Sequence, residues 1–325
     1  MSDKKRNCKL DNLKAILIFF VVFGHLLECF DGTMRLWLYF VIYSFHMPAF
    51  IYVTGYFSKF DPERLIKKLG YSYLVYQFLY LMFQRHYLLQ ENQIQFTQPY
   101  WLLWYLVSLI CWILLIPVID WAGVNRKTVL GMVFVCALLT GYDKSVGYYL
   151  SLSRSVVLFP FFVLGHYRIM GREQMKHGKA GMIISVAVII ISMFYLRNNL
   201  TEIQGNWLYH SVPYNGTFSI VSRAAIFCVA LAWIFLLLRL VPDKEVPLLT
   251  DIGKYTLTIF LCHGFIVKWI AKVGLFQWIQ VGDIFVAVIL SVIICLCFGN
   301  KIVTRILSFT FSIDWRTWFR VDNVK

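Results

Sequence analysis

Long apolar runs, separated by short polar segments, follow one another along nearly the whole chain. Most are long enough for an α-helix that crosses a bilayer core of ~30 Å. No stretch alternates apolar and polar residues as the strands of a membrane barrel do. We therefore predict an all-α, polytopic transmembrane protein with about ten spans, forming one domain over residues 1–325. The predicted spans are about 13–30, 36–57, 69–88, 100–119, 128–142, 153–167, 180–196, 217–240, 255–273 and 284–308.

Composition supports this pattern: 59% of the residues are hydrophobic, 15% are charged, and the mean hydropathy is +0.66. Such values are typical of helical membrane proteins and exclude a soluble chain with one core. A net charge of +14 would suit a nucleic-acid-binding protein. The cations, however, cluster at one set of loops, as the positive-inside rule requires of a membrane protein. With the N-terminus inside, 23 of the 31 lysines and arginines fall on the cytoplasmic side. We predict that both termini are cytoplasmic and that no nucleic acid is bound.

The eight cysteines mostly lie inside apolar runs and lack the spacing of metal ligands. We interpret them as packing residues and expect no metal cofactor. The chain shows no convincing internal repeat, which argues against the common transporter folds built from two related halves.

The first apolar run carries ionisable residues on one helical face. Asp11, Lys14, His25 and Glu28 fall within roughly a 100° arc of an α-helix. Lys14 and His25 are separated by ~16 Å along the helix axis. Ionisable groups cost several kcal/mol when they face lipid, so this stripe faces protein or water. It is either a helix end with snorkelling Lys14 and Glu28 and one structural histidine, or part of a functional site.

Further ionisable residues recur at similar depths in later spans. With the orientation above, His46 and His263 lie near the middle of their spans, and Arg154 and Arg223 begin theirs at the outer ends. A single buried imidazole is usually structural. Several imidazoles with cations nearby indicate an active site or an ion path.

A second cluster lies on the cytoplasmic side, in the segment 61–68 that opens the third span. Arg64 shares a helical face with Lys67 or Lys68 if the segment is α-helical. Together with Lys14, these cations could bind a phosphorylated ligand from the cytoplasm. Ordinary anchoring by positive residues explains any one of them equally well.

The longest loop, about 197–216, lies on the outer side. It carries Trp207, Tyr209, His210 and Tyr214, which suit a lid over a sugar or an ordinary aromatic belt. Both interpretations stay open.

Six motifs in chain order resemble the membrane acyltransferase family called acyltransferase 3, and two of them, in the second and sixth predicted spans, resemble its fucose 4-O-acetylase-like branch. The resemblance runs from about Lys9 to the tenth span. Family members usually carry Arg at the positions of Lys14 and Lys67, and Lys binds phosphate as a point charge rather than bidentately. The motifs are Leu10-Asp11-x-Leu13-Lys14 with His25; Ser44-Phe45-His46-Met47-Pro48-Ala49-Phe50 with Gly55-Tyr56-Phe57; Arg64-x-x-Lys67; Trp101-x-x-Trp104-Tyr105-Leu106; Ser153-Arg154 with Phe159-Pro160-Phe161-Phe162-x-x-Gly165; and Ile252-Gly253-Lys254-Tyr255-Thr256-Leu257 with Leu261-Cys262-His263-Gly264.

This resemblance implies an O-acetyltransferase that moves an acetyl group from cytoplasmic acetyl-CoA, the acyl donor, to a sugar hydroxyl outside. Cations at the inner face would hold the phosphates of the donor, namely Lys14, Arg64, Lys67 and Lys68. The ~16 Å from Lys14 to His25 is about the length of an extended pantetheine arm.

His25 would take the proton of the attacking hydroxyl, with Glu28 orienting its ring, or would itself be acylated and relay the acetyl group. Arg154, with His46 or His263, would steady the oxyanion or hold substrate groups. Arg223 and Trp104 are further candidates for substrate binding.

We expect a multi-pass protein of a bacterial plasma membrane, surrounded by membrane lipids, that acts on a glycan. The acceptor would be a capsular or wall polysaccharide or its lipid-linked precursor. The acceptor sugar, the acylated position and the oligomeric state, a homo-oligomer included, stay open. The competing interpretation is a transporter or flippase for a lipid-linked or charged solute, in which the histidines relay protons.

Overall fold

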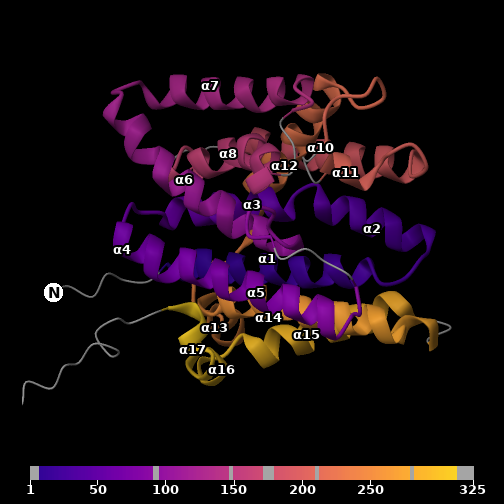
Figure 1. The fold of residues 1–325 in the computed structure, drawn as a ribbon. Helices are drawn as coiled ribbons and strands as arrows, with labels where there is room; N and C mark the ends of the chain where they lie inside the picture. The colour runs from indigo at the N-terminus through magenta and orange to yellow at the C-terminus, as the bar shows by residue number, and fades with distance from the viewer. Residues whose placement is uncertain are drawn as a thin grey trace, which may run out of the picture.

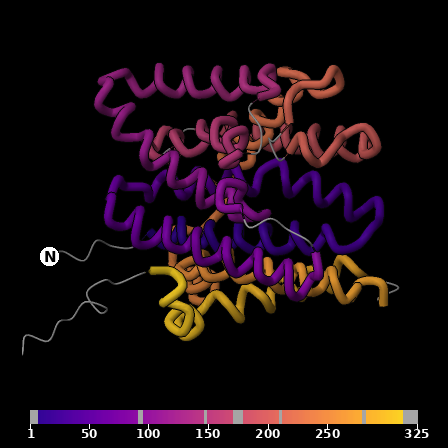
Figure 2. Tube along the Cα trace, in the orientation of Figure 1, coloured from indigo at the N-terminus to yellow at the C-terminus, as the bar shows by residue number. Residues whose placement is uncertain are grey.

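The computed structural model describes residues 7–90, 95–145, 149–170, 179–208, 212–278 and 282–312, and in these ranges the regular structure is entirely helical. Its long helices run alongside one another in stacked layers, with the first helices in the middle and the last ones along one edge (Figures 1 and 2). The all-α prediction is confirmed for the described residues.

A helix occupies each of the ten predicted segments. Within the described residues, seven helical stretches are long and apolar enough to cross a membrane, which agrees with a multi-pass membrane protein. The other three predicted segments form shorter helices, and the count of ten crossings and the side of the termini stay predictions. The seven are α1 (Cys8–Leu27), α2 (Thr33–Tyr43) continued by α3 (His46–Phe57), η2 (Trp101–Leu103) continued by α6 (Trp104–Trp121), η4 (Tyr149–Ser151) continued by α8 (Leu152–His166), α10 (Lys179–Asn198), α12 (Ile220–Leu240) and α14 (Thr256–Val273). The shorter three are α5 (Tyr71–His86), α7 (Arg126–Leu139) and α15 (Asp283–Phe298).

Helix α1 lies at the centre of the bundle. It contacts α2, α3, α14, α15 and the short helix α13 (Pro247–Lys254). Of its most apolar stretch, 72% is buried, against 11% for α10, four of whose five isoleucines are exposed. An apolar helix whose polar stripe is enclosed by five others avoids the cost of charges in lipid.

Two glycines let α3 and α8 approach closely. A Cβ at Gly55 would lie 2.2 Å from the carbonyl oxygen of Phe162, and one at Gly165 would lie 1.9 Å from that of Tyr52. Small residues facing each other are how membrane helices gain backbone-to-backbone packing. This contact explains why both glycines stand in the motifs of their helices.

The second predicted span is not one continuous helix. The helix is interrupted at Ser44 and Phe45, between α2 and α3. Pro48 has no N–H to donate to the carbonyl of Ser44, so the helix cannot run through this point. The break places His46 in the first turn of α3, where it turns toward α1.

The tenth predicted span, 284–308, is also interrupted, so the prediction of one continuous helix over these residues is wrong. α15 ends at Phe298, and the side chain of Asn300 accepts a hydrogen bond from the Val303 amide to start α16 (Lys301–Ile306). The short helix α17 (Ser308–Phe311) follows.

Helix α13 was not predicted as a separate element. The amide of Asn12, fully buried on α1, donates to the carbonyls of Pro242 and Lys244, and its oxygen accepts from Thr250. Gly253 lies against the backbone of α1, since a Cβ there would be 1.9 Å from the carbonyl oxygen of Asp11. These contacts fix the end of α1 that carries Lys14.

Candidate active site

A small cavity encloses the His25 end of α1. It has a volume of about 190 Å³. Seven α-helices, the short helix η2 and the residue after α1 line it, so its shape depends on many parts of the bundle. We call it the His25 cavity; its lining is Val21, His25, Glu28, Tyr43, His46, Met47, Trp101, Leu102, Trp104, Arg154, Leu158, Leu208 and Phe260.

His25, Glu28 and Tyr43 form one hydrogen-bonded group in this cavity. The Tyr43 hydroxyl donates to Glu28 Oε1 over 2.6 Å, and His25 Nδ1 lies 3.3 Å from the same oxygen and 3.1 Å from the hydroxyl. Because the Tyr43 hydroxyl uses its hydrogen in the bond to Glu28, both the hydroxyl oxygen and the carboxylate oxygen near Nδ1 of His25 act as acceptors. The proton of a neutral ring therefore belongs on Nδ1, and Nε2 keeps its lone pair. That arrangement suits a general base or a nucleophile.

His46 and His263 adopt the same tautomer as each other. Nδ1 of His46 donates to the carbonyl of Ile42 over 2.8 Å, and Nδ1 of His263 donates to that of Ile259 over 2.9 Å. Each ring therefore presents an unprotonated Nε2. His46 lines the cavity, whereas His263 is fully buried and stacks on His25 with ring centroids 5.6 Å apart. Within the described residues, Nε2 of His263 has no hydrogen-bond partner.

The two predicted arginines lie in different places. Arg154 lines the His25 cavity, with its guanidinium carbon 5.2 Å from the ring centre of Trp104, which also lines it. Arg223 is fully buried and donates to the carbonyls of Ala137 and Val212 instead. It lines neither of the two cavities described here. The structure thus brings Arg154 and Trp104 to His25. Arg223 instead joins the end of α7 to the segment that precedes α12.

A larger cavity of about 630 Å³ lies at the Lys14 end of α1. Its size falls within the ~300–1,000 Å³ typical of small-molecule sites. We call it the Lys14 cavity. Its lining is Asp11, Lys14, Phe50, Thr54, Phe57, Ser58, Lys59, Asp61, Arg64, Leu65, Leu69, Tyr105, Leu106, Leu109, Ile113, Thr256, Leu257 and Phe260.

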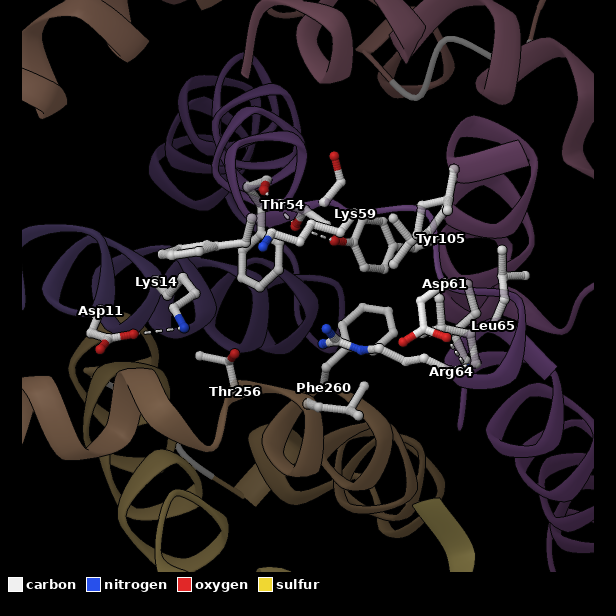
Figure 3. A pocket seen from close by; sticks show the side chains of 18 residues that line it. Asp11, Lys14, Thr54, Lys59, Asp61, Arg64, Leu65, Tyr105, Thr256 and Phe260 are labelled. Carbon is white, nitrogen blue, oxygen red and sulfur yellow. Dashed lines mark hydrogen bonds and ion pairs between the residues drawn. The ribbon is translucent and has the colours of Figure 1, made fainter. Parts of the chain in front are cut away.

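Three cations from different elements line the Lys14 cavity, as Figure 3 shows: Lys14 of α1, Lys59 after α3, and Arg64 of α4 (Pro62–Arg64). Lys14 pairs with Asp11 over 2.8 Å. Asp61 caps α4 by accepting from the amide of Arg64 over 3.0 Å, so its carboxylate is committed to the backbone. The cavity can therefore take an anionic ligand.

Lys67 and Lys68 do not line the Lys14 cavity. Lys67 forms an ion pair with Glu63 over 2.6 Å. The predicted common face assumed α-helical spacing, but residues Leu65–Gly70 form a π-helix (η1), whose wider turn rotates these lysines away from Arg64. Lys59 takes their place.

Phe260 lines both cavities and so stands between them. Its ring packs edge-on against Tyr105, with centroids 5.3 Å apart, and Tyr105 bonds Thr54 over 2.5 Å. Phe260 and Tyr105 are almost completely buried, at 4% and 5% exposure. An aromatic partition therefore separates the two cavities, which lie at opposite ends of the same stripe on α1.

In the described part of the loop 197–216, one residue takes part in the site. Leu208, at the end of the short helix α11 (Gly205–Leu208), lines the His25 cavity. Trp207 stacks on Phe218, and Tyr214 donates to the carbonyl of Leu138. Tyr209 and His210 lie outside the described residues.

Sequence reasoning missed Tyr43, Lys59 and Phe260. Tyr43 directly precedes the motif at Ser44 and Lys59 follows the one ending at Phe57, so their positions were visible signals. Phe260 is one phenylalanine in an apolar run, and no pattern in the sequence sets it apart.

Comparison with known proteins gives a family. The model of an acyltransferase domain, acyltransferase 3, matches residues 9–299. A nodulation protein, NolL of Mesorhizobium japonicum, is 47% identical over 58 residues. That match spans 16% of this chain and 16% of the length of NolL. No solved structure matches significantly.

Proposed function

Because this chain belongs to the acyltransferase 3 family, we propose that it is a membrane-embedded O-acetyltransferase. It uses acetyl-CoA from the cytoplasm and acetylates a sugar hydroxyl of a cell-surface polysaccharide, or of its lipid-linked precursor, on the other side. The observation that carries this proposal is the pair of cavities on one face of α1, with cations at the Lys14 end and the His25–Glu28–Tyr43 group at the other.

The Lys14 cavity would hold the donor. Lys14, Lys59 and Arg64 offer three positive charges to the phosphates of CoA. Lys14 and His25 are ~16 Å apart by the helix rise, about the reach of an extended pantetheine arm. The nucleotide thus stays at one face while the thioester reaches the His25 cavity past Phe260.

The chemistry then needs a base and a site for negative charge. The acceptor oxygen attacks the thioester carbonyl carbon and gives its proton to Nε2 of His25. The C–S bond breaks as the ester forms, and the proton passes on to the departing thiolate. Glu28 and Tyr43 keep the ring in the required tautomer and stabilise its protonated form. Arg154 lies within the same cavity to offset the charge of the tetrahedral intermediate.

The test is a transfer assay with the purified protein. Labelled acetyl-CoA and a glycan extract from the envelope of the source cells should yield labelled glycan and free CoA. His25→Ala should abolish both while the protein elutes as the wild type does in detergent. A wild-type protein that neither releases CoA nor labels glycan would contradict the proposal and favour a transporter.

A further inference from the structure

His46 presents an unused hydrogen-bond acceptor to the His25 cavity. The residue lies in the first turn of α3, is 2% exposed, and donates from Nδ1 to the carbonyl of Ile42. Because a neutral ring carries its one proton on Nδ1, Nε2 can only accept. Within the described residues, Nε2 of His46 has no hydrogen-bond partner, yet it is not enclosed as Nε2 of His263 is. Since His46 lines the cavity, this nitrogen is available to a ligand there.

The interruption between α2 and α3 fixes the ring of His46 in place. Ile42 belongs to α2, so the bond from Nδ1 joins the two helices across the interruption. Tyr43 packs edge-on against the same ring, with centroids 4.7 Å apart. A ring that is held by both a hydrogen bond and an aromatic contact keeps one orientation, which a group that selects one ligand hydroxyl requires.

His46 and His25 differ in what a positive charge on the ring would meet. Nδ1 of His25 lies 3.3 Å from the carboxylate of Glu28, which offsets the charge that this ring gains as a base. The ring of His46 is hydrogen-bonded to a neutral carbonyl instead, and a buried charge that is not directly paired is costly. His46 therefore stays neutral during the transfer and accepts a hydrogen bond without taking the proton.

The proposed reaction brings two kinds of hydrogen-bond donor to this region, the hydroxyls of the sugar and the amide groups of the pantetheine arm. The position of His46 favours the sugar. Phe50, one turn further along α3, lines the Lys14 cavity and packs edge-on against Tyr105 of the partition, with centroids 5.8 Å apart. His46 lines the His25 cavity and not the Lys14 cavity. It therefore lies on the acceptor side of the partition.

The size of the His25 cavity limits how far apart the bound groups can be. Its volume of about 190 Å³ is below the ~300–1,000 Å³ typical of sites that hold a whole small molecule. Two hydroxyls that bind His25 and His46 in this space therefore belong to one sugar ring and lie next to each other on it.

We infer that the acceptor sugar carries a second free hydroxyl beside the one that is acetylated, and that Nε2 of His46 accepts its hydrogen bond. This inference rests on the proposed function and adds the class of acceptor, a sugar with neighbouring free hydroxyls, and the residue that selects the position. The second hydroxyl keeps its hydrogen and is not consumed. The reacting hydroxyl still gives its proton to His25.

Two variants of His46 separate this role from a structural one. His46→Leu removes the acceptor and should raise the KM for envelope glycan from the source cells ~tenfold, while the KM for acetyl-CoA stays the same. His46→Gln should restore most of the affinity, because its amide oxygen can accept. Ser44→Ala is the matched control, since Ser44 lies at the same interruption, bonds the carbonyl of Val41 and lines neither cavity. It should leave both KM values at those of the wild type.

The kinetic results distinguish failure of the inference from failure of the proposed function. A wild-type KM for glycan in His46→Leu would overturn the inference alone. A rise confined to the KM for acetyl-CoA would also overturn it, because the ring would then face the donor. An equal rise in His46→Leu and His46→Gln would show that the acceptor atom is not what matters. If the wild type neither labels glycan nor releases CoA, the proposed function fails as well.

The position of the acetyl group gives a readout that a purely structural role of His46 would not change. With isotopically labelled acetyl-CoA, NMR of the product locates the acetylated hydroxyl. The wild type should acetylate one position, and His46→Leu should divide the label between that hydroxyl and its neighbour, because no residue then selects between them. The same single position in both enzymes would overturn the inference.

The acceptor can also be changed while the enzyme stays intact. Periodate cleaves the bond between two carbons that carry neighbouring free hydroxyls, and borohydride then reduces the products. Envelope glycan treated in this way should no longer be labelled by the wild-type protein, whereas glycan treated with borohydride alone should be. Labelling that survives periodate would overturn the inference, even if His46→Leu does not fold.

Discussion

The Tyr43 hydroxyl donates a 2.6 Å hydrogen bond to the carboxylate of Glu28, which also lies 3.3 Å from Nδ1 of His25. One residue from α2 therefore aligns two residues from the end of α1. The bond keeps Glu28 as an acceptor beside the imidazole and fixes which ring nitrogen carries the proton.

Tyr43→Phe should lower the rate of acetyl transfer ~tenfold, because it removes one hydrogen bond of about 1.4 kcal/mol from the group that orients His25. The KM for acetyl-CoA should stay the same. The control is Tyr71→Phe, which loses a hydroxyl bonded to the carbonyl of Phe309 away from either cavity. Steady-state kinetics compare them, and a Tyr43→Phe enzyme with wild-type kcat would rule out the aligning role.

The donor cavity can be tested with three cation variants. Arg64→Gln should raise the KM for acetyl-CoA ~tenfold and Lys59→Gln should raise it several-fold, because both line the Lys14 cavity. Lys67→Gln should change it at most ~twofold, since Lys67 pairs with Glu63 outside that cavity and exposed pairs contribute little. Isothermal titration calorimetry with CoA should rank the dissociation constants of the three variants in the same order. A larger effect for Lys67→Gln than for Arg64→Gln would show that the donor binds elsewhere.

Phe260 should control passage between the cavities and the length of the acyl group. Phe260→Ala opens the partition, so butyryl-CoA should be used more efficiently relative to acetyl-CoA, by ~tenfold or more. The change is measured as the ratio of kcat/KM for butyryl-CoA to kcat/KM for acetyl-CoA in each variant. Phe285→Ala is the control, because that ring is 68% exposed on α15. An unchanged ratio in Phe260→Ala would place the acyl route elsewhere.

The close contact of α3 and α8 predicts a strong effect of one methyl group. Gly165→Ala should lower the unfolding temperature, because its Cβ would overlap the carbonyl oxygen of Tyr52, and overpacking costs ~1–3 kcal/mol or more. Gly131→Ala, on α7, is the matched control, since no atom lies within 4 Å of its Cβ. Thermal unfolding in detergent should show a lower midpoint for Gly165→Ala alone. Equal midpoints for the two variants would contradict the packing.

The sequence predicted those features of the fold and of the candidate site that follow from the regular spacing of residues along a helix. Hydrophobic runs located a helix in every predicted segment. The predicted stripe on the first helix contains Lys14 and His25, which line the two cavities at either end of α1. Depth in the membrane also brought His46, His263 and Arg154 near His25. These inferences used only distance along one helix or position within one span.

What the sequence did not reveal depends on departures from regular geometry. The break before His46 brings Tyr43 to Glu28, and the π-helix after Arg64 turns Lys67 and Lys68 away from the cavity that Lys59 joins. Arg223 was predicted at a suitable depth, but its guanidinium donates to backbone carbonyls. The place of Phe260 depends on the tertiary contact of its ring with Tyr105 of α6, which no local pattern encodes.

The central claim is that an acetyl group crosses the membrane from the Lys14 cavity to His25 while its carrier stays behind. The most direct test uses vesicles that contain the reconstituted protein in one orientation, with labelled acetyl-CoA sealed on the Lys14 side and the glycan acceptor on the other. We predict labelled glycan on the acceptor side and free CoA retained with the donor, and neither with His25→Ala. Labelled glycan formed by His25→Ala, or CoA found on the acceptor side, would contradict the account.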